Sequence, residues 1–79
     1  MKKVTIYTKD YCPYCRAAKQ MLTARGISYL EHDVQGDDAK LQEMIDRSGR
    51  FTVPQIFFGD HHIGGHSDLV KYLAKRRAA

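Results

Sequence analysis

The sequence has few cysteines and no long hydrophobic run, and each shortage excludes a class of protein. Only two of its 79 residues are cysteine. A disulfide between Cys12 and Cys15 would close a loop too short to stabilise a small core appreciably. A membrane-spanning helix needs about 20 consecutive apolar residues, whereas the longest apolar run is 56–58. Lys9 and Asp10 also interrupt the apolar stretch that a secretion signal requires. The sequence therefore predicts one cytoplasmic domain, residues 1–79, without a membrane partner.

The charge is basic overall but unevenly distributed. The formal net charge is +4, with six basic and one acidic residue in 1–28 but two basic and six acidic residues in 29–49. A second basic group lies at the end of the chain, at Lys71, Lys75, Arg76 and Arg77. No aromatic residue follows Tyr72 to stack on a base, and cations suit the C-terminal end of a helix. We therefore expect a solvated helix end and no nucleic-acid partner, with a nucleic-acid-binding module as an alternative.

Hydrophobic periodicity predicts seven elements. Pro13 suits a helix start, and Gly26 ends the helix that follows it. Asp37 or Asp38 can cap a second helix. The expected strands are 3–8, 27–33, 55–58 and a short one around 62–63; the expected helices are 13–25, 38–48 and one that follows Gly64-Gly65. The last helix should turn Leu69, Val70, Leu73 and Ala74 inward.

This order of elements, β-α-β-α-β-β-α, predicts an α/β fold. A strand–helix–strand opening implies a parallel pair joined by a right-handed crossover. The tight turn at Gly59-Asp60 implies that the last two strands are antiparallel. The expected result is a four-stranded mixed sheet flanked by helices.

The two cysteines stand in Cys-Pro-Tyr-Cys, between the first strand and the first helix. Residues i and i+3 share one face of a helix, so the two sulfurs can approach each other. Cys12 should lie at the helix N-terminus, which favours the thiolate, with Lys9 and Arg16 adding positive potential. Cys15, one turn further along, should be shielded and remain a thiol. We therefore predict thiol–disulfide chemistry in which Cys12 attacks and Cys15 resolves.

A zinc site is the alternative use of the cysteines. His61 or His62, together with His66, could complete a set of metal ligands. However, 45 residues separate Cys15 from His61, whereas about 12–15 separate the ligand pairs of a finger-type module. We expect no metal and treat the histidines as belonging to a solvated turn.

Four motifs in this order resemble those of the glutaredoxins, the small dithiol branch of the thioredoxin fold. The motifs are Lys9 ahead of Cys12-Pro13-Tyr14-Cys15, then Ser48-Gly49-Arg50, then Thr52-Val53-Pro54, and Gly64-Gly65 leading to Ser67-Asp68. The resemblance implies a thioredoxin-like fold and a groove for glutathione. It also implies a cis Val53–Pro54 peptide facing the sulfurs.

The resemblance assigns a role to each residue of that groove. Val53 would present its N–H and C=O to glutathione, beside Pro54. Lys9 would pair with the glycyl carboxylate, Tyr14 would form a wall beside the sulfur, and Thr52 would line the groove. The backbone at Gly64-Gly65, with helix N–H groups, would receive the γ-glutamyl carboxylate; Ser67 would cap the last helix, and Asp68 could meet the ammonium group. His66, which is also expected to contact glutathione, stands where many members carry a further cysteine.

The resemblance implies a monomeric glutathione-dependent thiol–disulfide oxidoreductase, with glutathione as co-substrate. Its partners would be glutathionylated or disulfide-containing proteins, ribonucleotide reductase among the candidates. The nearest alternative is a redoxin that takes electrons from thioredoxin reductase and donates them to ribonucleotide reductase. Pro13-Tyr14 and Thr52-Val53 count against that alternative. Iron–sulfur binding through glutathione occurs mostly in relatives without a proline after the first cysteine, so Pro13 counts against it as well.

Overall fold

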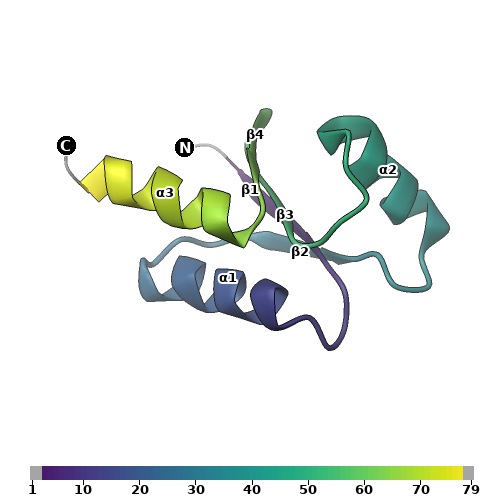
Figure 1. The fold of residues 1–79 in the computed structure, drawn as a ribbon, viewed down its shortest axis with the longest axis horizontal. Helices are drawn as coiled ribbons and strands as arrows, with labels where there is room; N and C mark the ends of the chain where they lie inside the picture. The colour runs from purple at the N-terminus through teal and green to yellow at the C-terminus, as the bar shows by residue number, and fades with distance from the viewer. Residues whose placement is uncertain (1–2, 78–79) are drawn as a thin grey trace.

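Four strands and three helices follow one another in the predicted order. The computed structural model describes residues 3–77, although the side chains of 76 and 77 lie outside the described part. The elements are β1 (Val4–Thr8), α1 (Pro13–Ala24), β2 (Leu30–Asp33), α2 (Asp38–Ser48), β3 (Gln55–Phe58), β4 (His61–Gly64) and α3 (His66–Arg77). Helices α1 and α3 cover one face of the sheet and α2 covers the other (Figure 1).

The sheet has the strand order β2-β1-β3-β4. Strand β1 pairs in parallel with β2, Ile6 opposite Glu31, and antiparallel with β3, Ile6 opposite Ile56. Strands β3 and β4 are also antiparallel. The predicted four-stranded mixed sheet is therefore confirmed.

The two central strands carry apolar side chains on both faces because both faces are covered by helices. Ile6 and Ile56 belong to a wholly apolar cluster shared with α1 and α3. Tyr7 and Phe57, one residue further along each strand, point to the opposite face and pack with Met44 of α2. The alternation of the pleat thus divides the core into two clusters.

The α2 face of the sheet holds a network of polar and aromatic groups. Arg47 donates a hydrogen bond from Nη1 to the Tyr7 hydroxyl at 2.9 Å, and its guanidinium carbon lies 4.0 Å from the centre of the Phe57 ring. The Tyr7 hydroxyl in turn donates to Glu43. Burial, followed by the hydrogen bond to Glu43, raises the pKa of Tyr7. The charged groups of α2 are therefore paired where they meet the sheet.

Two elements differ from the predictions. Strand β2 begins at Leu30, not at Ile27, because pairing with β1 begins there. Ile27 instead packs against the apolar cluster. In α3, Leu69 and Leu73 are buried, but Val70 and Ala74 are exposed. The inward orientation predicted for Val70 and Ala74 is therefore wrong. Helix α3 packs on the core through a narrow stripe that contains Leu69 and Leu73, and the apolar residues next to that stripe face solvent.

The helix ends follow local chemistry. Cys12 and Asp37 are the N-caps of α1 and α2, and the Asp37 side chain accepts a hydrogen bond from the Lys40 N–H at 3.0 Å. Gly49 ends α2 with a φ of 70°, in the left-handed region that glycine adopts without steric cost. Between residues 3 and 77 we find no helix whose length and apolar character would let it cross a membrane. The predicted solvation of Arg76 and Arg77 lies outside the described side chains.

Candidate active site

Cys12 lies where α1, the β1–α1 loop and the segment before β3 meet. As N-cap of α1, it accepts a hydrogen bond at Sγ from the N–H of Cys15 at 3.2 Å. Its Sγ also lies 3.9 Å from the carbonyl oxygen of Val53. Cys12 is partly exposed, and its backbone is fixed at the start of the helix.

Cys15 lies one turn further along α1 and is only 2% exposed. Burial, followed by the hydrogen bond with Cys12, raises the pKa of Cys15 to about 12, against a lowering influence from the Lys9 backbone. The prediction that the second cysteine is shielded is therefore confirmed, and its raised pKa favours the thiol form. The two thiols stand in different environments although only two residues separate them.

A groove of about 360 Å³ lies beside Cys12, along the segment before β3 and the start of α3. The Val53–Pro54 peptide bond is cis. The residues that line the groove are Tyr14, Arg50, Thr52, Val53, Pro54, Gln55, Gly65, His66, Ser67 and Asp68. The structure thus brings together the predicted groove residues except Lys9 and Gly64.

Lys9 is exposed and is not among the residues that line the groove. Its backbone, directly after β1, instead forms a hydrogen bond with Cys15. The pairing of Lys9 with a carboxylate of glutathione stays a prediction.

The start of α3 is organised by Asp68. Its Oδ2 accepts a hydrogen bond from the Gly65 N–H at 2.9 Å and lies 3.6 Å from Arg50 Nη1. These contacts, the Gly65 hydrogen bond first, lower the pKa of Asp68. Gly64 has a φ of 120°, and a Cβ there would lie 2.3 Å from Asp68 Oδ2. Glycine is therefore required at this position by both conformation and space.

Ser67 does not cap α3. The helix begins at His66, which places Ser67 inside the first turn. The predicted cap is therefore wrong, and the side chain that reaches back to the N–H of Gly65 belongs to Asp68. In a capping box, the side chain of the third helical residue likewise accepts a hydrogen bond from the N–H of the cap residue.

Two further residues, Arg50 and Gln55, line the groove although the sequence did not predict them there. Arg50 belongs to the Ser48-Gly49-Arg50 motif, but its closeness to Asp68 is visible only in the folded structure. Gln55 is 1% exposed and donates from Nε2 to the Thr52 carbonyl at 3.0 Å. Its Oε1 lies 2.7 Å from His62 Nε2. The sequence did contain one indication of this role: Gln55 is a lone polar residue at the start of an apolar strand, and a buried amide needs hydrogen-bond partners.

The aromatic side of the groove is formed by Tyr14 and His66. Their ring centroids lie 5.8 Å apart, at a tilt of 37°. His66 thus occupies the groove wall at the start of α3 and partly covers Tyr14. This contact links the Cys-Pro-Tyr-Cys segment to the last helix.

The described residues, 3–77, contain no group of three or more His, Cys, Asp or Glu side chains that could hold a metal ion. His62, one of the suggested ligands, is instead bound to Gln55 and stacked on Phe57, with ring centroids 4.9 Å apart. The zinc-site alternative therefore gains no support from the geometry.

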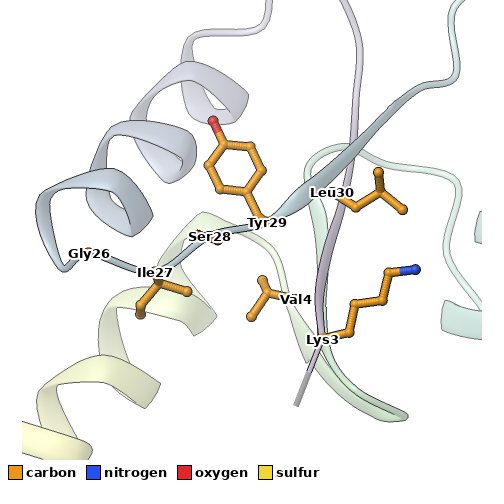
Figure 2. Close-up of a pocket in the computed structure, with 7 residues that line it drawn as sticks. All are labelled: Lys3, Val4, Gly26, Ile27, Ser28, Tyr29 and Leu30. Carbon is orange, nitrogen blue, oxygen red and sulfur yellow. The ribbon is translucent and has the colours of Figure 1, made fainter. Parts of the chain in front are cut away.

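A second pocket lies at the other end of α1, directly after Gly26. It has a volume of about 480 Å³, and its lining is mostly apolar. Val4, Ile27 and Tyr29 lie on the side of β1 that faces α1, whereas Lys3 and Leu30 lie on its other side (Figure 2). Its lining contains no cysteine, histidine or carboxylate.

Comparison with known proteins assigns the family. The sequence model of the glutaredoxin family matches residues 4–63. The chain belongs to the glutaredoxin family. It is 55% identical to glutaredoxin 3 of Escherichia coli strain K12 over 69 residues, which cover 87% of this chain and 83% of that protein.

Solved glutaredoxins have the same fold. The solution structure of glutaredoxin from Brucella melitensis matches with a TM-score of 0.82 and 41% identity, covering 99% of this chain and 85% of that one. The crystal structure of a buckwheat glutaredoxin–glutathione complex matches with a TM-score of 0.84 and 25% identity, covering 96% and 72%. The predicted thioredoxin-like fold is thereby confirmed, and the chain is a thiol–disulfide oxidoreductase of the glutaredoxin family.

Proposed function

We propose that this glutaredoxin uses glutathione to reduce protein–glutathione mixed disulfides and protein disulfides. The observation that carries the proposal is the groove beside Cys12, which runs from Val53 to the start of α3. Its volume of about 360 Å³ falls within the range of about 300–1,000 Å³ that small-molecule sites span.

The charges along the groove suit the charged groups of glutathione. The tripeptide carries two carboxylates and one ammonium group. Arg50 and the unpaired N–H groups of the first turn of α3 suit a carboxylate. Asp68, whose pKa is lowered chiefly by the Gly65 hydrogen bond, keeps its negative charge and suits the ammonium. Lys9 would serve the remaining carboxylate from outside the groove lining.

The backbone at Val53 supports the same orientation. Its carbonyl oxygen lies 3.9 Å from Cys12 Sγ, so a peptide paired with Val53 in the manner of an added strand would hold its own sulfur near Cys12. Thr52 is fixed on one side by Gln55, which donates hydrogen bonds to both its carbonyl and its hydroxyl. The binding segment is therefore held in place before glutathione arrives.

In the first reaction, the Cys12 thiolate attacks the glutathione sulfur of a glutathionylated protein. The new Cys12–glutathione disulfide forms as the old disulfide breaks, and the protein leaves as a thiolate, which takes up a proton. The thiolate of a second glutathione then attacks the glutathione sulfur bound to Cys12. Oxidised glutathione leaves, and the Cys12 thiolate is restored.

In the second reaction, Cys12 attacks a protein disulfide and becomes linked to that protein. Cys15 loses its proton and attacks Cys12 Sγ, forming the Cys12–Cys15 disulfide and releasing the protein dithiol. The formation of the mixed disulfide removes the negative charge of Cys12 and its hydrogen bond with Cys15, which both raise the pKa of Cys15. Cys15 thus becomes easier to ionise when it is needed, and two glutathione molecules later reduce the pair.

The test is NADPH consumption with cysteine–glutathione disulfide as substrate. One arm supplies glutathione and glutathione reductase, and the other supplies thioredoxin reductase alone. We expect turnover in the first arm and little in the second. Turnover with thioredoxin reductase alone would favour the redoxin alternative, and the absence of turnover with glutathione would contradict the proposed function.

A further inference from the structure

The most exposed large hydrophobic side chains of the described residues belong to the two chain segments that meet at the Cys12 sulfur, 11–14 and 51–53. Tyr11 is 94% exposed, Phe51 75% and Tyr14 65%, whereas the other two large exposed side chains, Leu30 and Val70, are only 42% and 40% exposed. Tyr11 precedes Cys12 directly. Exposed aromatic rings concentrated at one place mark an interaction surface more often than rings scattered singly.

Tyr11 is held in a conformation that its own residue type does not favour. Its φ is 58°, in the left-handed region, and it is the one described non-glycine residue with a positive φ. No hydrogen bond or ring contact from another described residue fixes its side chain. An unfavourable backbone conformation that presents an aromatic ring to solvent suggests a role outside the fold.

Phe51 lies in the second chain segment that reaches the reactive sulfur, the segment before β3. It lies two residues before Val53, whose carbonyl oxygen is 3.9 Å from Cys12 Sγ. Neither Phe51 nor Tyr11 is among the residues that line the groove. Tyr11 is therefore next to Cys12 in the chain, and Phe51 is two residues from the Val53 carbonyl that contacts the Cys12 sulfur, while neither ring lines the groove.

The charge next to these rings is positive. Lys9 and Arg16, on either side of Cys12 in the chain, are exposed. The ion pairs of the described side chains include neither of them. Asp10 is the nearby acidic residue, and its N–H is bound to the Gln35 side chain. A partner with acidic residues would therefore be attracted to this side of the molecule.

We propose that Tyr11 and Phe51 form a docking surface for a polypeptide segment that carries an oxidised cysteine beside large apolar and acidic residues. The proposal rests on the proposed function and defines which protein substrates it favours. Aromatic side chains such as these can each bury roughly 150–250 Å², an area that a polypeptide can cover and the cysteine of a small mixed disulfide cannot. The surface would then select among glutathionylated proteins while leaving the chemistry at Cys12 unchanged.

The test uses a double variant, Tyr11→Asn with Phe51→Ser. Asparagine tolerates the left-handed region, so it removes the ring and keeps the backbone conformation. The substrates are a synthetic glutathionylated peptide with phenylalanine and aspartate beside its cysteine, a peptide with glycine and serine there, and cysteine–glutathione disulfide. The control is Leu30→Ser with Val70→Ser, which removes two exposed apolar side chains elsewhere.

We expect kcat/KM of the double variant to fall by about tenfold on the phenylalanine–aspartate peptide. Its kcat/KM on the other two substrates should stay within about twofold of the unmodified protein, as should the control variant on all three. An equal fall on all substrates, or no fall on the first peptide, would overturn the docking surface alone. If the unmodified protein failed to reduce cysteine–glutathione disulfide, the proposed function would be overturned and the docking surface with it.

Discussion

The two ends of α1 present pockets of similar size and different chemistry. The groove at its start holds Arg50, Asp68 and His66 and lies beside the sulfur of the partly exposed Cys12. The pocket after its end is lined mainly by apolar side chains, and its lining contains no cysteine, histidine or carboxylate. Volume therefore does not identify the reactive site: the smaller pocket, of about 360 Å³ against about 480 Å³, is the one that holds paired charges and adjoins a nucleophile through Val53.

The largest effect should come from removing the nucleophile at the groove end. Cys12→Ser replaces a thiolate with a hydroxyl that does not attack disulfides, so turnover should fall by about a thousandfold or more. The measurement is the glutathione-coupled NADPH assay with cysteine–glutathione disulfide. Leu30→Ser, at the apolar end, is the control and should turn over at the rate of the unmodified protein. An equal loss of turnover in this variant would contradict the assignment of the chemistry to the groove end alone.

The next largest effect separates the two thiols. Cys15→Ser should retain the reduction of cysteine–glutathione disulfide within a few-fold, because that reaction needs only Cys12. Reduction of a protein disulfide such as that of insulin should fall by about a hundredfold, since no second thiol releases the substrate. If the first activity were lost and the second kept, the roles assigned to the cysteines would be reversed.

A smaller effect is expected from the charge at the start of α3. Asp68→Asn removes the negative partner proposed for the ammonium of glutathione, so the KM for glutathione should rise by about tenfold with little change in kcat. Asp46→Asn makes the same substitution on the exposed face of α2, where Asp46 accepts a hydrogen bond from Gln42, and should leave KM unchanged. Equal KM values in the two variants would remove Asp68 from the binding site.

At the apolar end, substitutions should change stability and leave binding alone. Ile27 packs against the apolar cluster and is partly buried, so Ile27→Ala should lower the free energy of unfolding by about 1–2 kcal/mol. Urea denaturation measures this loss, and the KM for glutathione should not move. A raised KM in this variant would show that the two ends are coupled.

The smallest effect concerns pH. Burial opposes ionisation of Glu31, but hydrogen bonds from Lys19 and Thr8 outweigh it and lower the pKa of Glu31. Because the unfolded chain then binds the proton more readily, this stabilisation is present above about pH 4.3 and is lost as the pH falls through the folded-state pKa. Unfolding of the protein and of Glu31→Gln, compared from pH 3 to 7, should show a stability difference that shrinks at low pH. A difference that stays constant would contradict this.

The sequence predicted the parts of the molecule that depend on local pattern. The order of the elements predicted the four-stranded mixed sheet flanked by helices, and the spacing of Cys12 and Cys15 placed one thiol at a helix start and the other a turn deeper. The order of motifs brought Val53 and Asp68 to one groove. The sheet and the two thiol positions follow from periodicity, spacing and the chemistry of helix ends, whereas the shared groove follows from the resemblance to the glutaredoxins.

The rest depends on contacts between residues distant in the chain. Gln55 is held at the groove by hydrogen bonds of its amide with Thr52 and His62. No local sequence pattern predicts those two partners. Ser67 and Asp68 are both good partners for a helix N-terminus, so only the observed start at His66 distinguishes them. Lys9 lies outside the groove lining, and its backbone forms a hydrogen bond with Cys15 that no local pattern indicates.

The central claim is that glutathione bound to Cys12 lies along the groove and leaves the apolar end of α1 untouched. The direct test is the change in backbone amide NMR shifts when Cys15→Ser forms its mixed disulfide with glutathione. We expect one glutathione on Cys12 and shift changes at Val53, Gly65 and Asp68, with none from Ile27 to Leu30. Absence of the adduct, or shift changes concentrated between Ile27 and Leu30, would contradict the account.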